Sequence, residues 1–61
     1  MTLEILKSKI EYGDYNTLGK MLEISSPSAA ARFKRNDFEA IEAMTLLIER
    51  KEQLIKDYQT R

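Results

Sequence analysis

The chain has 61 residues, enough for one domain, and a domain of this size buries so little surface that dimerisation is one common way of stabilising it. It contains no cysteine and no histidine, so we expect no disulfide, no metal or other cofactor, and no enzyme built on the usual catalytic nucleophiles and bases. Its formal net charge is zero, and no apolar run approaches the roughly 18 residues of a membrane-spanning helix; together with an N-terminus unlike a signal peptide, this indicates a cytoplasmic protein.

The first predicted element is a helix from Thr2 to about Tyr12. Leu3, Leu6 and Ile10 recur at the spacing of one helix face. Gly13 follows at the place where a helix commonly ends in a left-handed residue. We therefore expect this helix to stop at Gly13.

A short second helix is expected from Tyr15 to about Leu22. Asp14 precedes it and is predicted to be its N-terminal cap, because a carboxylate accepts hydrogen bonds from the free N–H groups of a helix start. Leu18 and Met21 are among its apolar residues.

The third predicted helix begins at Pro27 and ends near Arg35. Ser26 supplies a hydroxyl cap, and proline is favoured at the first helical position because its missing N–H costs nothing there. Asn36 or Asp37 can then cap the next helix.

The fourth predicted helix runs from about Phe38 to Gln59, which at about 1.5 Å per residue makes a rod of roughly 33 Å. A compact domain of this length has a diameter of only roughly 27 Å. The first half of the helix is expected to close the core through Phe38, Ile41, Met44, Leu47 and Ile48. No run alternates as a strand would, so the predicted fold class is all-α, with four helices of which the last is long.

The second half of this helix continues the apolar stripe beyond the expected core. An alternation by three and four, typical of a coiled-coil seam, runs through Ile41, Met44, Ile48, Lys51, Ile55 and Tyr58. It predicts a homodimer whose interface contains Ile48, Lys51, Leu54, Ile55 and Tyr58. Alternatively, the end of the helix folds back onto the first helix. The orientation of the dimer, and whether Lys51 lies inside the seam or at its rim, stay open.

The stretch "SSPSAAARFKR", residues 25–35, concentrates basic side chains. Residues 1–35 carry six basic and four acidic residues, whereas residues 36–61 carry four basic and six acidic. On the third helix Ala30 and Phe33 share the predicted inner face, bordered by Lys34. The opposite face carries Ser28, Ala31, Arg32 and Arg35. Such a face suits a phosphate-lined groove, although basic residues at a helix C-terminus also stabilise the helix without any ligand.

The segment "YNTLGKMLEISSPSAAARFKR" resembles the helix-turn-helix of Cro/repressor-type regulators, which are common in phages and bacteria. The resemblance covers about residues 14–36 and includes apolar Leu18 before small Gly19, apolar Leu22 and Ile24, and inward residues on the second helix. Glu23 stands where the family usually has glycine, and inward positions at Ala30 and Phe33 would require a turn about one residue longer. The resemblance implies one helix-turn-helix domain over residues 1–61, with residues 37–60 as its dimerisation helix.

By this resemblance the chain would be a sequence-specific, repressor-like regulator of transcription that binds double-stranded DNA as a homodimer, at half-sites about one helical turn apart. The residues implied as base or groove contacts are Ser26, Ser28, Arg32 and Arg35. Asn16 and Lys20 would contact backbone phosphates. The operator and the sign of regulation stay open.

Two alternative functions remain. A protein-interaction module, such as a phage-type inhibitor or antirepressor, would use the apolar face of the last helix, and the net charge of zero favours it. An RNA-binding helical hairpin is also conceivable, but the basic face carries no interleaved aromatic residues on which bases could stack.

Overall fold

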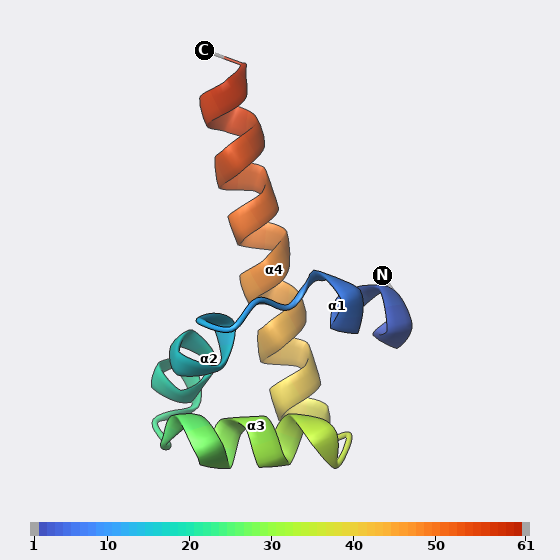
Figure 1. The fold of residues 1–61 in the computed structure, drawn as a ribbon, viewed down its shortest axis with the longest axis vertical. Helices are drawn as coiled ribbons and strands as arrows, with labels where there is room; N and C mark the ends of the chain where they lie inside the picture. Colours follow the sequence, from blue (N-terminus) through green and yellow to red (C-terminus); the bar gives the residue numbers. More distant parts are fainter. Residues whose placement is uncertain (1, 61) are drawn as a thin grey trace.

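This computed structural model describes residues 2–60 of the chain. These residues form four helices joined by short connections, with no strand among them. They are α1 (Leu3–Lys9), α2 (Asp14–Leu22), α3 (Ser26–Lys34) and α4 (Phe38–Gln59). α4 forms the long axis, α1 to α3 pack around its N-terminal half, and its C-terminal half extends away from them (Figure 1). The predicted all-α class with a long C-terminal helix is confirmed.

α1 is shorter than predicted and ends at Lys9 instead of near Tyr12. Thr2 caps its start, because the Thr2 hydroxyl oxygen accepts a hydrogen bond from the Ile5 N–H at 3.2 Å. The expected left-handed stop at Gly13 is wrong: Gly13 has a φ of −72° and is instead the N-cap of α2. The chain leaves α1 through an extended Ile10.

Asp14 is the first residue of α2, and the prediction that its side chain caps this helix is wrong. Its carboxylate turns back and accepts the Glu11 N–H at 2.8 Å. The same carboxylate binds the Lys51 ammonium group at 2.9 Å. Asp14 therefore ties the α1–α2 connection to the middle of α4 instead of serving its own helix.

α3 begins one residue earlier than predicted. Ser25, not Ser26, is the cap, since its hydroxyl oxygen accepts the Ser28 N–H at 3.3 Å. Ser26 is then the first helical residue and Pro27 the second, still within the first turn where a proline leaves no hydrogen bond unmade.

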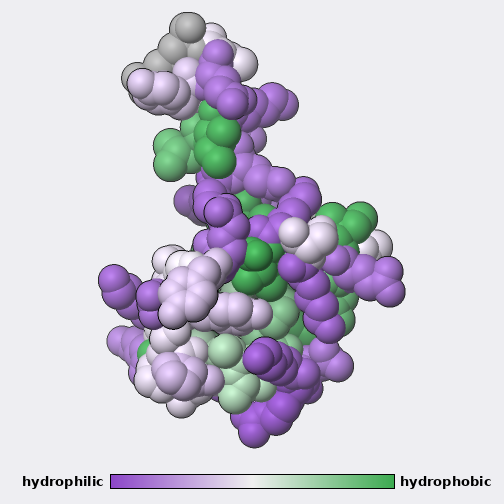
Figure 2. Space-filling model, viewed as in Figure 1, coloured by the Kyte–Doolittle hydropathy of each residue, from purple (hydrophilic) through white to green (hydrophobic). Residues whose placement is uncertain are grey.

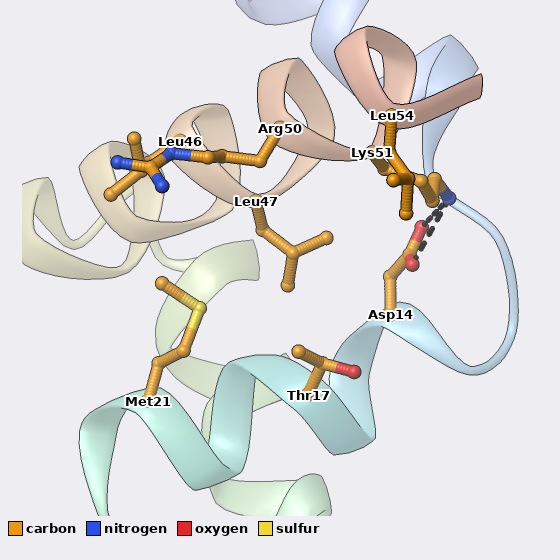
Figure 3. A pocket seen from close by; sticks show the side chains of 8 residues that line it. All are labelled: Asp14, Thr17, Met21, Leu46, Leu47, Arg50, Lys51 and Leu54. Atoms are coloured by element: carbon orange, nitrogen blue, oxygen red, sulfur yellow. Dashed lines mark hydrogen bonds and ion pairs between the residues drawn. The ribbon is translucent and has the colours of Figure 1, made fainter. Parts of the chain in front are cut away.

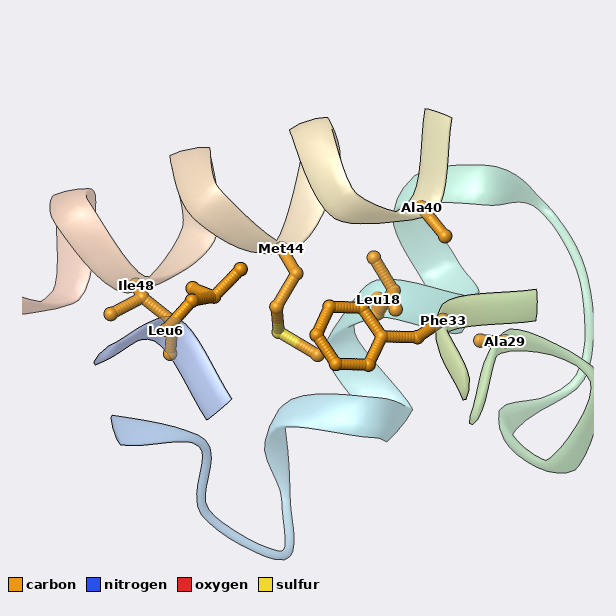
Figure 4. Packing of buried hydrophobic residues seen from close by; sticks show 7 residues of the cluster. All are labelled: Leu6, Leu18, Ala29, Phe33, Ala40, Met44 and Ile48. Carbon is orange, nitrogen blue, oxygen red and sulfur yellow. The ribbon is translucent and has the colours of Figure 1, made fainter. Parts of the chain in front are cut away.

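The core lies where the first three helices meet the N-terminal half of α4 (Figure 4). Its buried side chains are Leu6, Leu18, Ala29, Phe33, Ala40, Met44 and Ile48. On α3 the inward pair is Ala29 and Phe33, four residues apart, so the prediction of Ala30 at the centre of this face is off by one position. Ala30 is half-buried beside them.

Phe38 does not close the core as predicted, because its side chain is 77% exposed. Ala40, Met44 and Ile48 are spaced by four and define the inward face of α4. Phe38 precedes Ala40 by two residues, about 200° around the helix, and therefore points to the other side.

The C-terminal half of α4 does not fold back onto α1. Leu54 is 70% and Ile55 51% exposed, and Figure 2 shows hydrophobic surface on this protruding part of the helix. Ile48, which the sequence pattern placed both in the core and in a dimer seam, is buried in the core of its own chain. No helix within residues 2–60 combines the length and apolar character that crossing a membrane requires.

Candidate nucleic-acid interface

α2 and α3 are joined by a turn of three residues, Glu23 to Ser25, that brings the two helices into close contact. Glu23 has a φ of 59° and so adopts the left-handed conformation that usually favours glycine. The Ile24 N–H donates to the Gly19 carbonyl at 2.9 Å. A Cβ on Gly19 would lie 2.8 Å from the Ile24 carbonyl oxygen, so only glycine fits there without a shift of the backbone. With Ala29 as the inward residue of α3, the longer turn expected from the sequence is not needed.

The outer face of α3 is uncovered. Phe33 faces inward and makes an edge contact with Tyr15 at 6.3 Å between ring centroids. The exposed residues of α3 and its C-cap are Pro27, Ser28, Ala31, Lys34 and Arg35. Three of these are small or compact, which lets another molecule approach the helix backbone closely. α3 lies at the end of the molecule opposite the α4 C-terminus (Figure 1).

The N-terminal part of α3 lies beside the start of α2. Asn16 and Ser26, two of the predicted DNA contacts, line one shallow pocket of about 160 Å³ together with Tyr12. The Ser28 hydroxyl accepts a hydrogen bond from the Ser25 hydroxyl at 2.9 Å and is therefore part of the helix cap as well as exposed. Tyr12 is 96% exposed at this edge, and sequence reasoning missed it because it was assigned to the first helix.

Arg32 is held within its own chain. Its Nε donates to the Asp37 carboxylate at 2.7 Å, and its terminal nitrogen lies 3.6 Å from a Glu39 carboxylate oxygen. These two acidic residues offset the charge of Arg32 and fix its orientation. Of the two arginines predicted to contact DNA, the structure leaves only Arg35 fully exposed.

A pair of positively charged side chains lies beside α3. Lys7 of α1 and Lys34 of α3 line the same pocket of about 300 Å³, with Tyr15 and Phe33 as its floor. Lys7 could not be identified from the sequence, because its proximity to Lys34 depends on how the helices pack in three dimensions. Lys20 is exposed on α2, apart from this pair.

On another side of the molecule an apolar groove of about 590 Å³ lies between α2 and α4 (Figure 3). Its α2 wall is formed by Asp14, Thr17 and Met21, and its α4 wall by Leu46, Leu47, Arg50, Lys51 and Leu54. Hydrogen bonds to Asp14 and Glu11 close one end and raise the pKa of Lys51 above its ordinary value. Lys51 is thus held by two carboxylates of its own chain while it lines this groove.

No cluster of acidic side chains that could hold a metal ion occurs among residues 2–60. Comparison of the chain with sequence models of protein families, with curated proteins and with solved structures finds no match. The arrangement of side chains is therefore the basis on which a function can be argued.

Proposed function

We propose that the chain binds double-stranded DNA through α3, with α2 and α3 acting as a helix-turn-helix, and that it works as a homodimeric, repressor-like regulator of transcription in the cytoplasm. The observation that carries this proposal is the uncovered outer face of α3, made of small side chains and flanked by exposed cations. A short helix held against its predecessor by a tight turn is the arrangement with which such proteins enter the major groove.

The charge distribution supports this assignment. Between Tyr15 and Asn36 the chain has four basic residues and one acidic residue, although its net charge is zero. α4, from Phe38 to Gln59, has three basic and five acidic residues. Since Asp37 and Glu39 offset the charge of Arg32, the attraction of phosphates to the α3 end would come mainly from Lys34 and Arg35.

The individual roles follow from exposure. Arg35 and Lys34 are exposed at the C-terminal end of α3 and would contact phosphates or a guanine edge, with Lys7 beside them. Ser28 and Ala31 would face the groove. The DNA backbone would be contacted, at the other end of the helix-turn-helix, by Asn16, Lys20 and Ser26. Arg32 is fixed by Asp37 and would reach a phosphate only with its remaining N–H groups.

Replacing Lys34 and Arg35 together by alanine tests this proposal. Both side chains are exposed, so the fold should persist, while affinity for a mixed-sequence duplex should fall about tenfold and the salt slope by about one per lost phosphate contact. Fluorescence anisotropy over a salt series measures both quantities. Lys56→Ala, an exposed lysine on the protruding half of α4, is the matched control and should change neither. Equal binding by the double variant would remove α3 from the interface.

A second candidate function is a protein-interaction module that uses the exposed apolar part of α4. The exposure of Leu54 and Ile55 favours it. Its complexes would be held by apolar contacts and would therefore resist salt, whereas complexes with phosphates weaken steeply as salt rises.

A further inference from the structure

The groove between α2 and α4 is lined by apolar side chains that the described chain leaves partly uncovered. Met21 is 42%, Leu46 47% and Leu54 70% exposed along it. In Figure 3 the side chains of Met21 and Thr17 rise from α2 toward α4, Leu47 points down from α4 between them, and Leu54 lies farther along α4 beside Lys51. Leu54 therefore belongs both to the groove and to the protruding half of α4.

The length of this surface fits a helix lying along α4. A stable dimer buries about 800 Å² on each partner, and the described chain has an accessible surface of 4653 Å² in total. The two turns around Leu54 and Ile55 are too short to supply such an area alone. A helix that also entered the groove as far as Met21 and Leu46 would cover both parts.

The charges beside the groove distinguish the possible directions of that helix. Arg50 and Asp57 are seven residues apart, two turns, and so lie on the same flank of α4. Arg50 pairs with no carboxylate among the described residues, and Asp57 is oriented by a hydrogen bond of 2.8 Å from Gln53. In a parallel pair of α4 helices, Arg50 would lie level with the same arginine and with Lys51 of the second copy, which is repulsive.

An antiparallel pair brings opposite charges together. Two helices related by a two-fold axis perpendicular to them place the same flanks against each other, so Arg50 faces the partner's Asp57, and the reciprocal pair forms at the same time. The axis then passes beside Leu54. The C-terminal end of the partner's α4 enters the groove next to Leu47 and Met21.

We propose that this groove is the dimer interface and that its occupant is α4 of a second copy, running antiparallel. The dimer of the proposed function thereby acquires a defined surface and direction, and in that respect the inference rests on the proposed function. Since α3 lies at the end opposite the α4 C-terminus, the two α3 helices stand at opposite ends of the pair (Figure 1). Each would meet its own duplex segment, unlike the two half-sites one turn apart expected from the sequence.

Charge reversal tests the direction. Arg50→Glu and Asp57→Arg, made singly, each turn two attractive pairs into two repulsive ones and should raise the dimer dissociation constant about tenfold. The double variant Arg50→Glu/Asp57→Arg restores opposite charges and should dimerise as the natural chain does. Sedimentation equilibrium measures all three, and Glu49→Arg, an exposed change beside a different pocket of α4, is the control that should have no effect. Failure of the double variant to recover the dimer would overturn the antiparallel pairing.

Disulfide cross-linking is an independent test of the antiparallel direction, because the chain has no cysteine of its own. Mixing Arg50→Cys with Asp57→Cys should give the mixed disulfide in preference to either homodisulfide. Homodisulfides at position 50 would instead show a parallel pair. A chain that stays monomeric up to submillimolar concentration would also overturn the inference. If such a monomer still bound duplex DNA through α3, the DNA-binding part of the proposed function would stand and its homodimeric part would not, whereas a dimer that ignored duplex would refute the DNA binding and leave the interface intact.

Discussion

Lys51 connects three parts of the chain through one ammonium group. Its Nζ lies 3.0 Å from a Glu11 carboxylate oxygen and 2.9 and 3.1 Å from the two oxygens of Asp14. Asp14 is the one buried charged residue of the described chain, so its carboxylate depends on this partner and on the Glu11 N–H. The contact explains how the short α1–α2 connection is fixed against α4.

Replacing Lys51 by methionine should lower the free energy of unfolding by about 1–3 kcal/mol at neutral pH, because the buried Asp14 carboxylate loses its partner. The pKa of Lys51 is raised by the hydrogen bonds that it donates to Asp14 and Glu11, so its contribution to stability is fully present below the ordinary pKa of 10.5 and is lost as the pH rises through the higher folded-state pKa. Urea unfolding at neutral pH and at successive values above 10.5 should show the two proteins converging. A constant difference across this range would contradict the role given to Lys51, and Lys56→Met serves as the exposed control.

Arg32 shows which part of the candidate site the sequence does not reveal. Its place on α3 follows from helix periodicity, but its partner Asp37 lies five residues on, beyond the end of the helix. The two meet because Asn36 has a φ of 62° and reverses the chain between them. The exposure of Arg35 could be predicted from the helix pattern, whereas the neutralisation of Arg32 depends on this turn.

At the scale of the elements, the contact between α2 and α3 depends on Gly19. Gly19→Ala should lower the free energy of unfolding by about 1–2 kcal/mol, since the clash of a Cβ with the Ile24 carbonyl outweighs the gain in helix propensity. Gly13→Ala is a matched control: nothing lies within 4 Å of the added Cβ and φ is −72°, so the change should stabilise the chain by about 0.4–1 kcal/mol. Chemical denaturation measures both. A neutral Gly19→Ala would show that the turn can relax and that close approach is not required.

The elements themselves were largely predictable, and their ends were not. The spacing of Leu3 and Leu6, the Ser-Pro start of α3 and the long stripe of α4 all correspond to observed helices. The cap of α3 is Ser25 and not its neighbour Ser26. The two side chains are chemically identical, so the sequence does not distinguish them. The start of the helix follows instead from the packing that buries Ala29. Asp14 likewise does not cap α2 as expected, because its carboxylate binds Lys51 of α4.

At the scale of the whole molecule, opposite ends carry different surfaces. The α3 end presents small side chains and cations, while the protruding half of α4 presents Leu54 and Ile55 among charged residues (Figure 2). The proposed binding of DNA by one end and of a second chain by the other requires such a separation. The length of α4 predicted the protrusion, but the groove beside Met21 could not be foreseen, because it depends on how α2 crosses α4.

Binding of duplex DNA by α3 can be measured by the fluorescence anisotropy of a labelled mixed-sequence duplex, titrated with the natural chain at several salt concentrations. We expect binding at low salt that weakens steeply as the salt concentration rises, with a slope set by the number of phosphates contacted. No binding at low salt, or binding that does not change with salt, would contradict it.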